Sequence, residues 1–82
     1  MKKKISKTKI YEMPVIIEKD KKGYFFAICP SLQGCYAQGK NLEEAFKNIR
    51  EVIELHIEDR KERREDLPSL KPVSLTSLEI KV

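Results

Sequence analysis

The clearest pattern in the chain is a helical repeat of apolar residues between positions 42 and 57. They recur every three or four residues, so one stripe of the helix is apolar and the positions between are polar. We expect this stripe to lie against a sheet. It consists of Leu42, Ala45, Phe46, Ile49, Val52, Ile53 and Ile57, and the positions expected to face away are Glu43, Lys47, Asn48, Arg50, Glu51 and Glu54.

Local signals predict both ends of this helix. Asn41 can accept hydrogen bonds from the first backbone amides, and Glu44 three residues later can reach back, which is a variant of the capping box. At the other end, the mixed-charge run 58–66 is expected to continue the helix as an exposed, ion-paired end. Pro68 and Pro72 then turn the chain.

Three short strands are predicted before the helix. Residues 15–17 and 24–29 are apolar and aromatic runs joined by a polar loop, which indicates a hairpin. Pro30 removes a backbone donor and Gly34 permits a tight turn, so the second strand should stop near residue 29 and a third begin near Cys35.

Alternation along the second strand places apolar side chains on both of its faces. Tyr24, Phe26 and Ile28 share one face, and residues 25, 27 and 29 share the other. One helix covers only one face, so an aromatic face is left for a partner, and an unprotected edge strand invites pairing with another chain. The alternative is that the N-terminal or post-helix segment folds over that face.

The C-terminal segment also alternates. Leu78, Ile80 and Val82 alternate with charged residues, which fits a strand with one buried face, and we expect these three side chains to help build a homodimer. Val73 and Leu75 are out of phase with them. A bulge near residues 76–77, or two separate short strands, would explain the slip.

Length and composition restrict the class of protein to which the chain can belong. The chain has 82 residues, 40% of them hydrophobic and 37% charged, which indicates one small globular domain. We divide it into a basic tail, 1–9, and a single domain, 10–82. No apolar run has the length of a membrane span and the N-terminus lacks an apolar signal core, so a cytoplasmic protein is expected.

The basic character is confined to the tail. The net charge is +4, but five lysines precede the first acid, Glu12, and the remainder carries 12 basic residues against 13 acidic ones. A basic tail on a nearly neutral domain is weak support for nucleic-acid binding, which would show as salt-dependent affinity lost on deleting residues 1–9.

Candidate catalytic residues are few. Cys29, Cys35 and His56 are too few and too scattered for zinc, and the cysteines are expected to pack as reduced thiols. A metal-dependent nuclease would need converging carboxylates, and the only acids near predicted strands are Glu12, Glu18, Asp20 and Glu79. We therefore expect no enzyme activity, no catalytic or metal site and no cofactor.

Several short motifs follow one another in the chain. Their positions are Gly23, Tyr24, Pro30, Leu32, Gly34, Cys35, Gln38, Gly39, Glu43, Glu44, Ala45, Asn48, Ile49, Glu51, Ile53, Leu55 and His56. The order and spacing of these motifs resemble the HicB-like antitoxin family, over about residues 11–58. Asn41 departs from the family's usual Thr or Ser, and Ser31 stands where an acid is common. Residues 73–82 look like the closing strand of the short members.

This resemblance implies an α+β fold, a partial RNase H-like domain of β-β-β-α-β order that lacks the catalytic carboxylates of RNase H. It implies an antitoxin that neutralises a HicA-like toxin, a small basic ribonuclease that cleaves messenger RNA. Longer members carry a C-terminal DNA-binding segment. We expect no such segment here and therefore no operator binding, unless the lysine tail or a bound toxin supplies the contacts.

Combining both lines, we expect toxin neutralisation by steric occlusion and assembly as a homodimer or tetramer. The side chains expected to contact the toxin are Tyr24, Phe26, Tyr36 and Leu55. A stand-alone homo-oligomeric regulatory protein and a nucleic-acid-binding module remain as alternatives.

Overall fold

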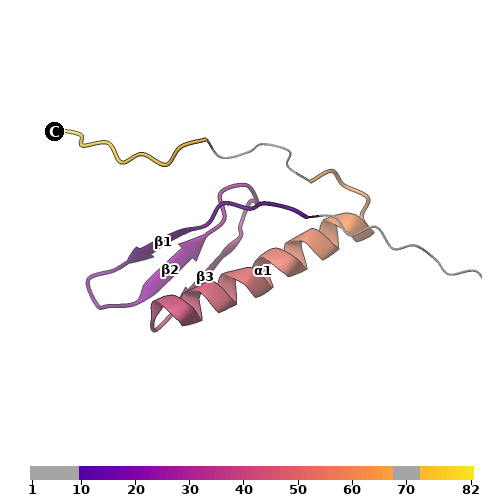
Figure 1. Ribbon diagram of the computed structural model, residues 1–82, viewed down its shortest axis with the longest axis horizontal. Coiled ribbons are helices and arrows are strands. Elements are labelled where there is room, and N and C mark those ends of the chain that lie inside the picture. The colour runs from indigo at the N-terminus through magenta and orange to yellow at the C-terminus, as the bar shows by residue number, and fades with distance from the viewer. Residues whose placement is uncertain (1–9, 68–72) are drawn as a thin grey trace, which may run out of the picture.

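The computed structural model describes residues 10–67 and 73–82 and has an α+β fold (Figure 1). Three strands, β1 (Ile16–Lys19), β2 (Phe25–Ile28) and β3 (Tyr36–Gly39), precede one helix, α1 (Leu42–Glu62). The strands form an antiparallel sheet in the order β1-β2-β3, and α1 packs mainly on β3 and β2. The expected basic tail, 1–9, and the turn at Pro68 and Pro72 lie outside the described residues.

The β1–β2 loop is closed by one carboxylate. Asp20 accepts hydrogen bonds from the amides of Lys22 and Tyr24, both at 2.9 Å, and its own amide donates to the Tyr24 carbonyl at 2.9 Å. Gly23 adopts φ +95°, a region that glycine enters without steric cost. Asp20 therefore shapes a turn, and the predicted hairpin is confirmed.

The β2–β3 connection is a compact loop that enters the core. The Cys29 amide donates to the Cys35 carbonyl at 2.9 Å, and the Leu32 amide donates to the Cys29 carbonyl at 3.2 Å. These bonds turn the Leu32 side chain inward, where it is buried. Gly34 allows the return with φ +74°.

The strand register assigns each side chain to one of two faces. Ala27 lies opposite Ile17 on β1 and Ala37 on β3, and this row faces α1. Ile28 lies opposite Ile16 and Tyr36, and this row faces away. The predicted split of β2 into two apolar faces, with α1 on one of them, is confirmed.

The core between sheet and helix is built mostly from small side chains. Gly39 illustrates how closely the layers approach, since a Cβ there would lie 2.8 Å from the Glu44 carbonyl carbon and 2.9 Å from the Ala45 Cα. Cys29 and Cys35 are free thiols and buried, as predicted. The buried hydrophobic residues are Ala27, Cys29, Leu32, Cys35, Ala45 and Ile49.

The start of α1 confirms the predicted cap. The Glu44 amide donates to Asn41 Oδ1 at 2.8 Å, while Glu44 Oε1 accepts from the Lys40 amide at 2.8 Å. Asn41 itself is extended, as the residue before a first helical turn usually is. The reciprocal bond thus reaches one residue further back than in an ordinary capping box.

The end of α1 comes earlier than predicted, at Glu62 and not near Asp66. Arg64 adopts φ +57°, and the amides of Arg64 and Glu65 donate to the carbonyls of Lys61 and Arg60 at 3.1 and 2.8 Å. This is the Schellman arrangement, which satisfies the last helical carbonyls and reverses the chain. The expected ion pairs occur across the turn, where Arg63 contacts Asp59 and Glu65.

The helical stripe is only partly covered, contrary to expectation. Ala45 and Ile49 are buried, but Leu42 and Phe46 are 52% and 57% exposed. A polar residue takes a place beside the sheet, because Asn48 Nδ2 donates to the Gln38 carbonyl at 2.8 Å. The prediction was wrong for Leu42, Phe46 and Asn48, because α1 packs on the sheet with the flank that carries Asn48, which turns Leu42 and Phe46 towards solvent.

The predicted closing strand is not formed. Residues Val73–Val82, here called the C-terminal arm, carry no strand, and all ten are exposed. Figure 1 shows the arm apart from both the sheet and α1. Alternation indicates which side chains share a face, but a strand also needs a neighbouring edge, and neither β1 nor β3 pairs with the arm.

Candidate functional site

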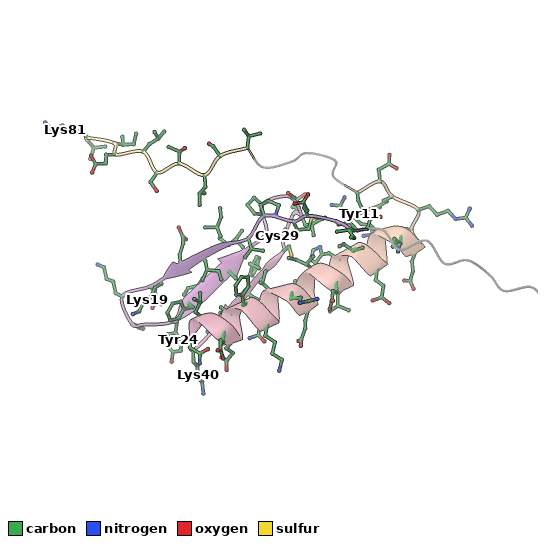
Figure 2. The ribbon with its side chains drawn as sticks, in the orientation of Figure 1. Tyr11, Lys19, Tyr24, Cys29, Lys40 and Lys81 are labelled. Atoms are coloured by element: carbon green, nitrogen blue, oxygen red, sulfur yellow. The ribbon has the colours of Figure 1, made fainter. Side chains whose placement is uncertain are left out.

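The open face of the sheet brings together three of the side chains predicted to contact a partner. Tyr24 is 42% exposed, Phe26 37% and Tyr36 69%. Phe26 on β2 and Tyr36 on β3 are diagonal neighbours, because Phe26 pairs with Gln38 and Tyr36 pairs with Ile28. Figure 2 shows Tyr24 at the hairpin end of the sheet, next to the β1–β2 turn.

Three further residues complete this surface, which we call the outer face. Ile16 and Ile28 stand in one cross-strand row with Tyr36, and Glu18 pairs with Phe26 in the next row. Ile28 is 39% exposed. Alternation along β1 and β2 predicts which side chains of each strand share a face. The position of Ile16 opposite Ile28 depends on the strand register, which alternation does not determine.

No described segment folds over the outer face. Its large side chains remain exposed, and none of the residues in 10–67 and 73–82 packs on them as a helix or strand. The alternative that a terminal segment covers this face is therefore not realised within the described residues. A contiguous apolar face of this kind on a small domain is typical of a protein-binding surface.

Leu55 lies elsewhere. It is 66% exposed and belongs to α1, which covers the opposite face of the sheet. Its helical position follows Asn48 by seven residues, so both lie on the flank of α1 next to β3. A partner that contacts Tyr36 and Leu55 together would have to span the β3 edge.

The predicted dimer residues Leu78, Ile80 and Val82 lie on the C-terminal arm, away from the outer face. Each is at least 75% exposed. Val73 and Leu75 on the same arm are also exposed, so the arm presents five uncovered apolar side chains. The structure thus separates the expected toxin contacts from the expected dimer contacts.

The described residues offer little for catalysis. Across 10–67 and 73–82 no three His, Cys, Asp or Glu side chains gather as metal ligands would. Burial, with a smaller effect of neighbouring Cys29, raises the pKa of the Cys35 thiol to about 11, which keeps it protonated and unreactive at neutral pH. In the same residues, no helix has the length and apolar character needed to cross a membrane.

Comparison with known proteins gives a consistent answer. A UPF0150 protein of Synechocystis sp. is 39% identical over 75 residues, covering 87% of this chain and 95% of the relative. A UPF0150 protein of Thermoplasma acidophilum is 46% identical over 54 residues, covering 66% and 78%. One from Helicobacter pylori is 57% identical over 44 residues, covering 54% and 60%. No solved structure gives a match.

The comparison with protein families covers the sheet, the helix and nearly all of the arm. The model of the HicB-like antitoxins of bacterial toxin–antitoxin systems matches residues 13–81. This range contains the β-β-β-α order, the capped helix and the buried Cys35 turn described above. The chain therefore belongs to the HicB-like antitoxin family.

Proposed function

We propose that this antitoxin neutralises a HicA-like, messenger-RNA-cleaving toxin by covering the toxin's RNA-binding surface with its outer face. The observation that carries the proposal is the uncovered group of large side chains on one face of the sheet, Phe26, Ile28 and Tyr36. Aromatic residues in such a position supply most of the binding free energy in many protein interfaces. Inhibition of this kind is stoichiometric and requires no chemistry from the antitoxin.

Charge supports the same surface. Glu18 stands beside Phe26 in the strand register and is exposed, so the outer face combines an aromatic centre with a carboxylate. A ribonuclease that binds RNA presents basic residues, and a carboxylate at the rim would favour the encounter with them. The proposed location is the cytoplasm, where messenger RNA is translated.

The test is a titration of purified toxin with the full-length chain, with RNA cleavage and binding affinity as readouts. We expect cleavage to stop at equimolar antitoxin. Phe26→Ala and Tyr36→Ala should each raise the Kd for the toxin by about tenfold or more. Phe46→Ala is the matched control, because Phe46 is also an exposed aromatic residue but lies on α1.

Leu55→Ala tests how far the contact extends. A tenfold weakening, about the same as for Tyr36→Ala, would mean that the toxin spans the β3 edge onto α1. If neither outer-face variant weakens binding, the proposal is wrong. Steeply salt-dependent RNA binding by the antitoxin alone, without toxin binding, would favour the nucleic-acid-binding alternative.

A further inference from the structure

Two thiols lie opposite each other at the end of the sheet where β2 leads into β3. The strand register pairs Ile28 with Tyr36, so the next position along brings Cys29 opposite Cys35. The Cys29 amide donates to the Cys35 carbonyl at 2.9 Å, which agrees with this pairing. Figure 2 shows Cys29 just beyond β2, where the loop to β3 begins.

Both side chains lie on the same face of the sheet. Cys29 and Cys35 continue the alternation of Ala27 and Ala37, and both are free thiols in the buried core beneath α1. Burial is the main reason why the pKa of Cys35 is raised, and the neighbouring Cys29 side chain adds to it, so the two thiols are in contact.

This arrangement meets the geometric requirement for a disulfide. The Cα atoms of a directly opposite, hydrogen-bonded pair are about 5.5 Å apart, within the range of about 4.4–6.8 Å that a disulfide spans. The bond therefore needs no change in the register of β2 and β3.

We propose that Cys29 and Cys35 form a reversible disulfide when the β2–β3 loop opens in the presence of hydrogen peroxide. The thiolate of one cysteine attacks a peroxide oxygen, which gives a sulfenic acid and one molecule of water. The second thiol then attacks the sulfenic sulfur, the S–S bond forms and the hydroxyl group leaves as water. The two thiols lose two hydrogen atoms and two electrons, and the peroxide is reduced to water. A dithiol reductant reverses the step by exchange.

Burial makes the reaction depend on loop opening. Cys29 and Cys35 are 0% and 1% exposed, so an oxidant does not reach them while the loop is closed. Leu32 is the one buried residue of the loop 30–34, and the residues around it are exposed or half-buried. Withdrawal of the Leu32 side chain opens the loop locally and exposes both thiols to solvent. When the loop closes again, the new disulfide is shielded from reductants as well.

The disulfide would join the two strand ends that carry part of the outer face. Ile28 precedes Cys29 and Tyr36 follows Cys35, and both lie on the face opposite to the thiols. The bond closes a loop of seven residues, 29–35, which favours the folded state about fiftyfold by restricting the unfolded chain. The proposal goes beyond toxin neutralisation and does not depend on it, because the bond forms within one chain.

The experiment exposes the full-length chain to hydrogen peroxide, removes the excess and analyses the product by mass spectrometry without reductant. The tryptic peptide 23–40 contains both cysteines, and we expect it to be lighter by two hydrogen atoms. Urea denaturation should then show a folding equilibrium constant about fiftyfold larger for the oxidised chain than for the reduced one. Dithiothreitol should abolish this difference.

Cys29→Ala and Cys35→Ala are the matched controls. Each keeps one thiol, so peroxide can add oxygen to it or link two chains, but the stabilised form within one chain should not appear. Each variant is compared with itself before and after oxidation, so stability lost through the substitution does not enter the result. Circular dichroism shows that each variant is folded.

Leu32→Ala tests the role of the loop. It weakens the contact that holds the loop closed, so the disulfide should form about tenfold faster or more at the same peroxide concentration. Four outcomes would each overturn the proposal: thiols that stay reduced after prolonged exposure, a bond that links two chains, an oxidised chain no more stable than the reduced one, or an unchanged rate in Leu32→Ala.

Discussion

The two faces of the sheet differ in the size of the side chains that they carry. On the face beneath α1 the strands contribute small residues such as Ala27 and Ala37, and Gly39 lies directly against the first turn of the helix. On the outer face, Phe26 and Tyr36 are large and exposed. Phe25 is the one aromatic residue of the three strands that packs on the core from the inner face, where it is half-buried.

The difference between the two faces separates the residues that stabilise the fold from those available to bind a partner. Small inner residues let α1 approach closely, so stability depends on tight packing with little tolerance for added or removed atoms. The outer residues contribute little to the fold of a single chain because their surface stays in water. Variants on the two faces should therefore affect different measurements.

The largest effect is expected at the centre of the inner face. Ile49→Ala should lower the free energy of unfolding by about 3–4 kcal/mol, because it removes buried methyl groups and leaves a cavity. Tyr36→Ala on the outer face should cost less than about 1 kcal/mol. Urea denaturation monitored by circular dichroism measures both, and equal losses would mean that the two faces do not differ as described.

Adding one methyl group at the closest approach should have nearly the same effect. In Gly39→Ala the new Cβ would lie 2.8 Å from the Glu44 carbonyl carbon. The neighbour is backbone and cannot rotate away, so we expect a loss of about 3 kcal/mol. Gly23→Ala, where no atom lies within 4 Å but φ is +95°, should cost about 1 kcal/mol. Thermal unfolding of both variants measures the two losses, and equal losses would contradict the close approach at Gly39.

High pH should weaken the inner face selectively. The pKa of the Cys35 thiol is raised from 9.0 to about 11 by burial and by Cys29, so above pH 9 the unfolded chain loses this proton before the folded chain does. Stability contributed by the protonated thiol is complete below pH 9 and falls by about 2 kcal/mol as pH rises to 11. Cys35→Ala should flatten this part of the stability curve relative to wild type; parallel curves would contradict the assignment.

The smallest effect is expected at the helix cap. Asn41→Ala removes the acceptor for the Glu44 amide and should cost about 1 kcal/mol, since that donor loses its only cap. Gln38→Ala is the control, because it removes a side-chain amide of similar size from the outer face. It should change the free energy of unfolding by less than about 0.5 kcal/mol. Hydrogen exchange of the first-turn amides of α1 is the direct measurement, and unchanged protection in Asn41→Ala would exclude the capping role.

Local patterns predicted most of the fold. The three strands, the hairpin, the two faces of β2 and the Asn41 cap follow from alternation and from turn and cap residues within a few positions of one another. Alternation also placed Tyr24, Phe26 and Ile28 on one face of β2, whereas the position of Tyr36 on the same face follows from the strand register. These features depend on neighbours in sequence, which the sequence displays directly.

The errors concern partners that are distant in sequence. A helix of 21 residues is about 32 Å long, whereas a strand of four residues is about 13 Å long, so the C-terminal half of α1 extends past the sheet (Figure 1). Phe46 lies beside the sheet, next to buried Ala45, and is exposed because its side of α1 does not face the strands. The C-terminal arm has the alternation of apolar and polar residues that a strand requires, but neither edge of the sheet pairs with it. Leu55, predicted as a further toxin contact, lies on the exposed flank of α1, and its role in toxin binding stays a prediction. Strand register and the lengths of the helix and strands depend on residues that are distant in sequence, so local patterns did not predict them.

One hydrogen bond bears on solubility. The Asn48 side chain occupies the Gln38 carbonyl on β3, whereas the corresponding margin of β1 has no strand or helix beside it among the described residues. A fibril formed by strand addition grows only if each molecule offers an unpaired edge strand on both sides of its sheet. By occupying an acceptor at the β3 edge, the Asn48 side-chain amide disfavours fibril growth there, although the outer face keeps its apolar side chains exposed.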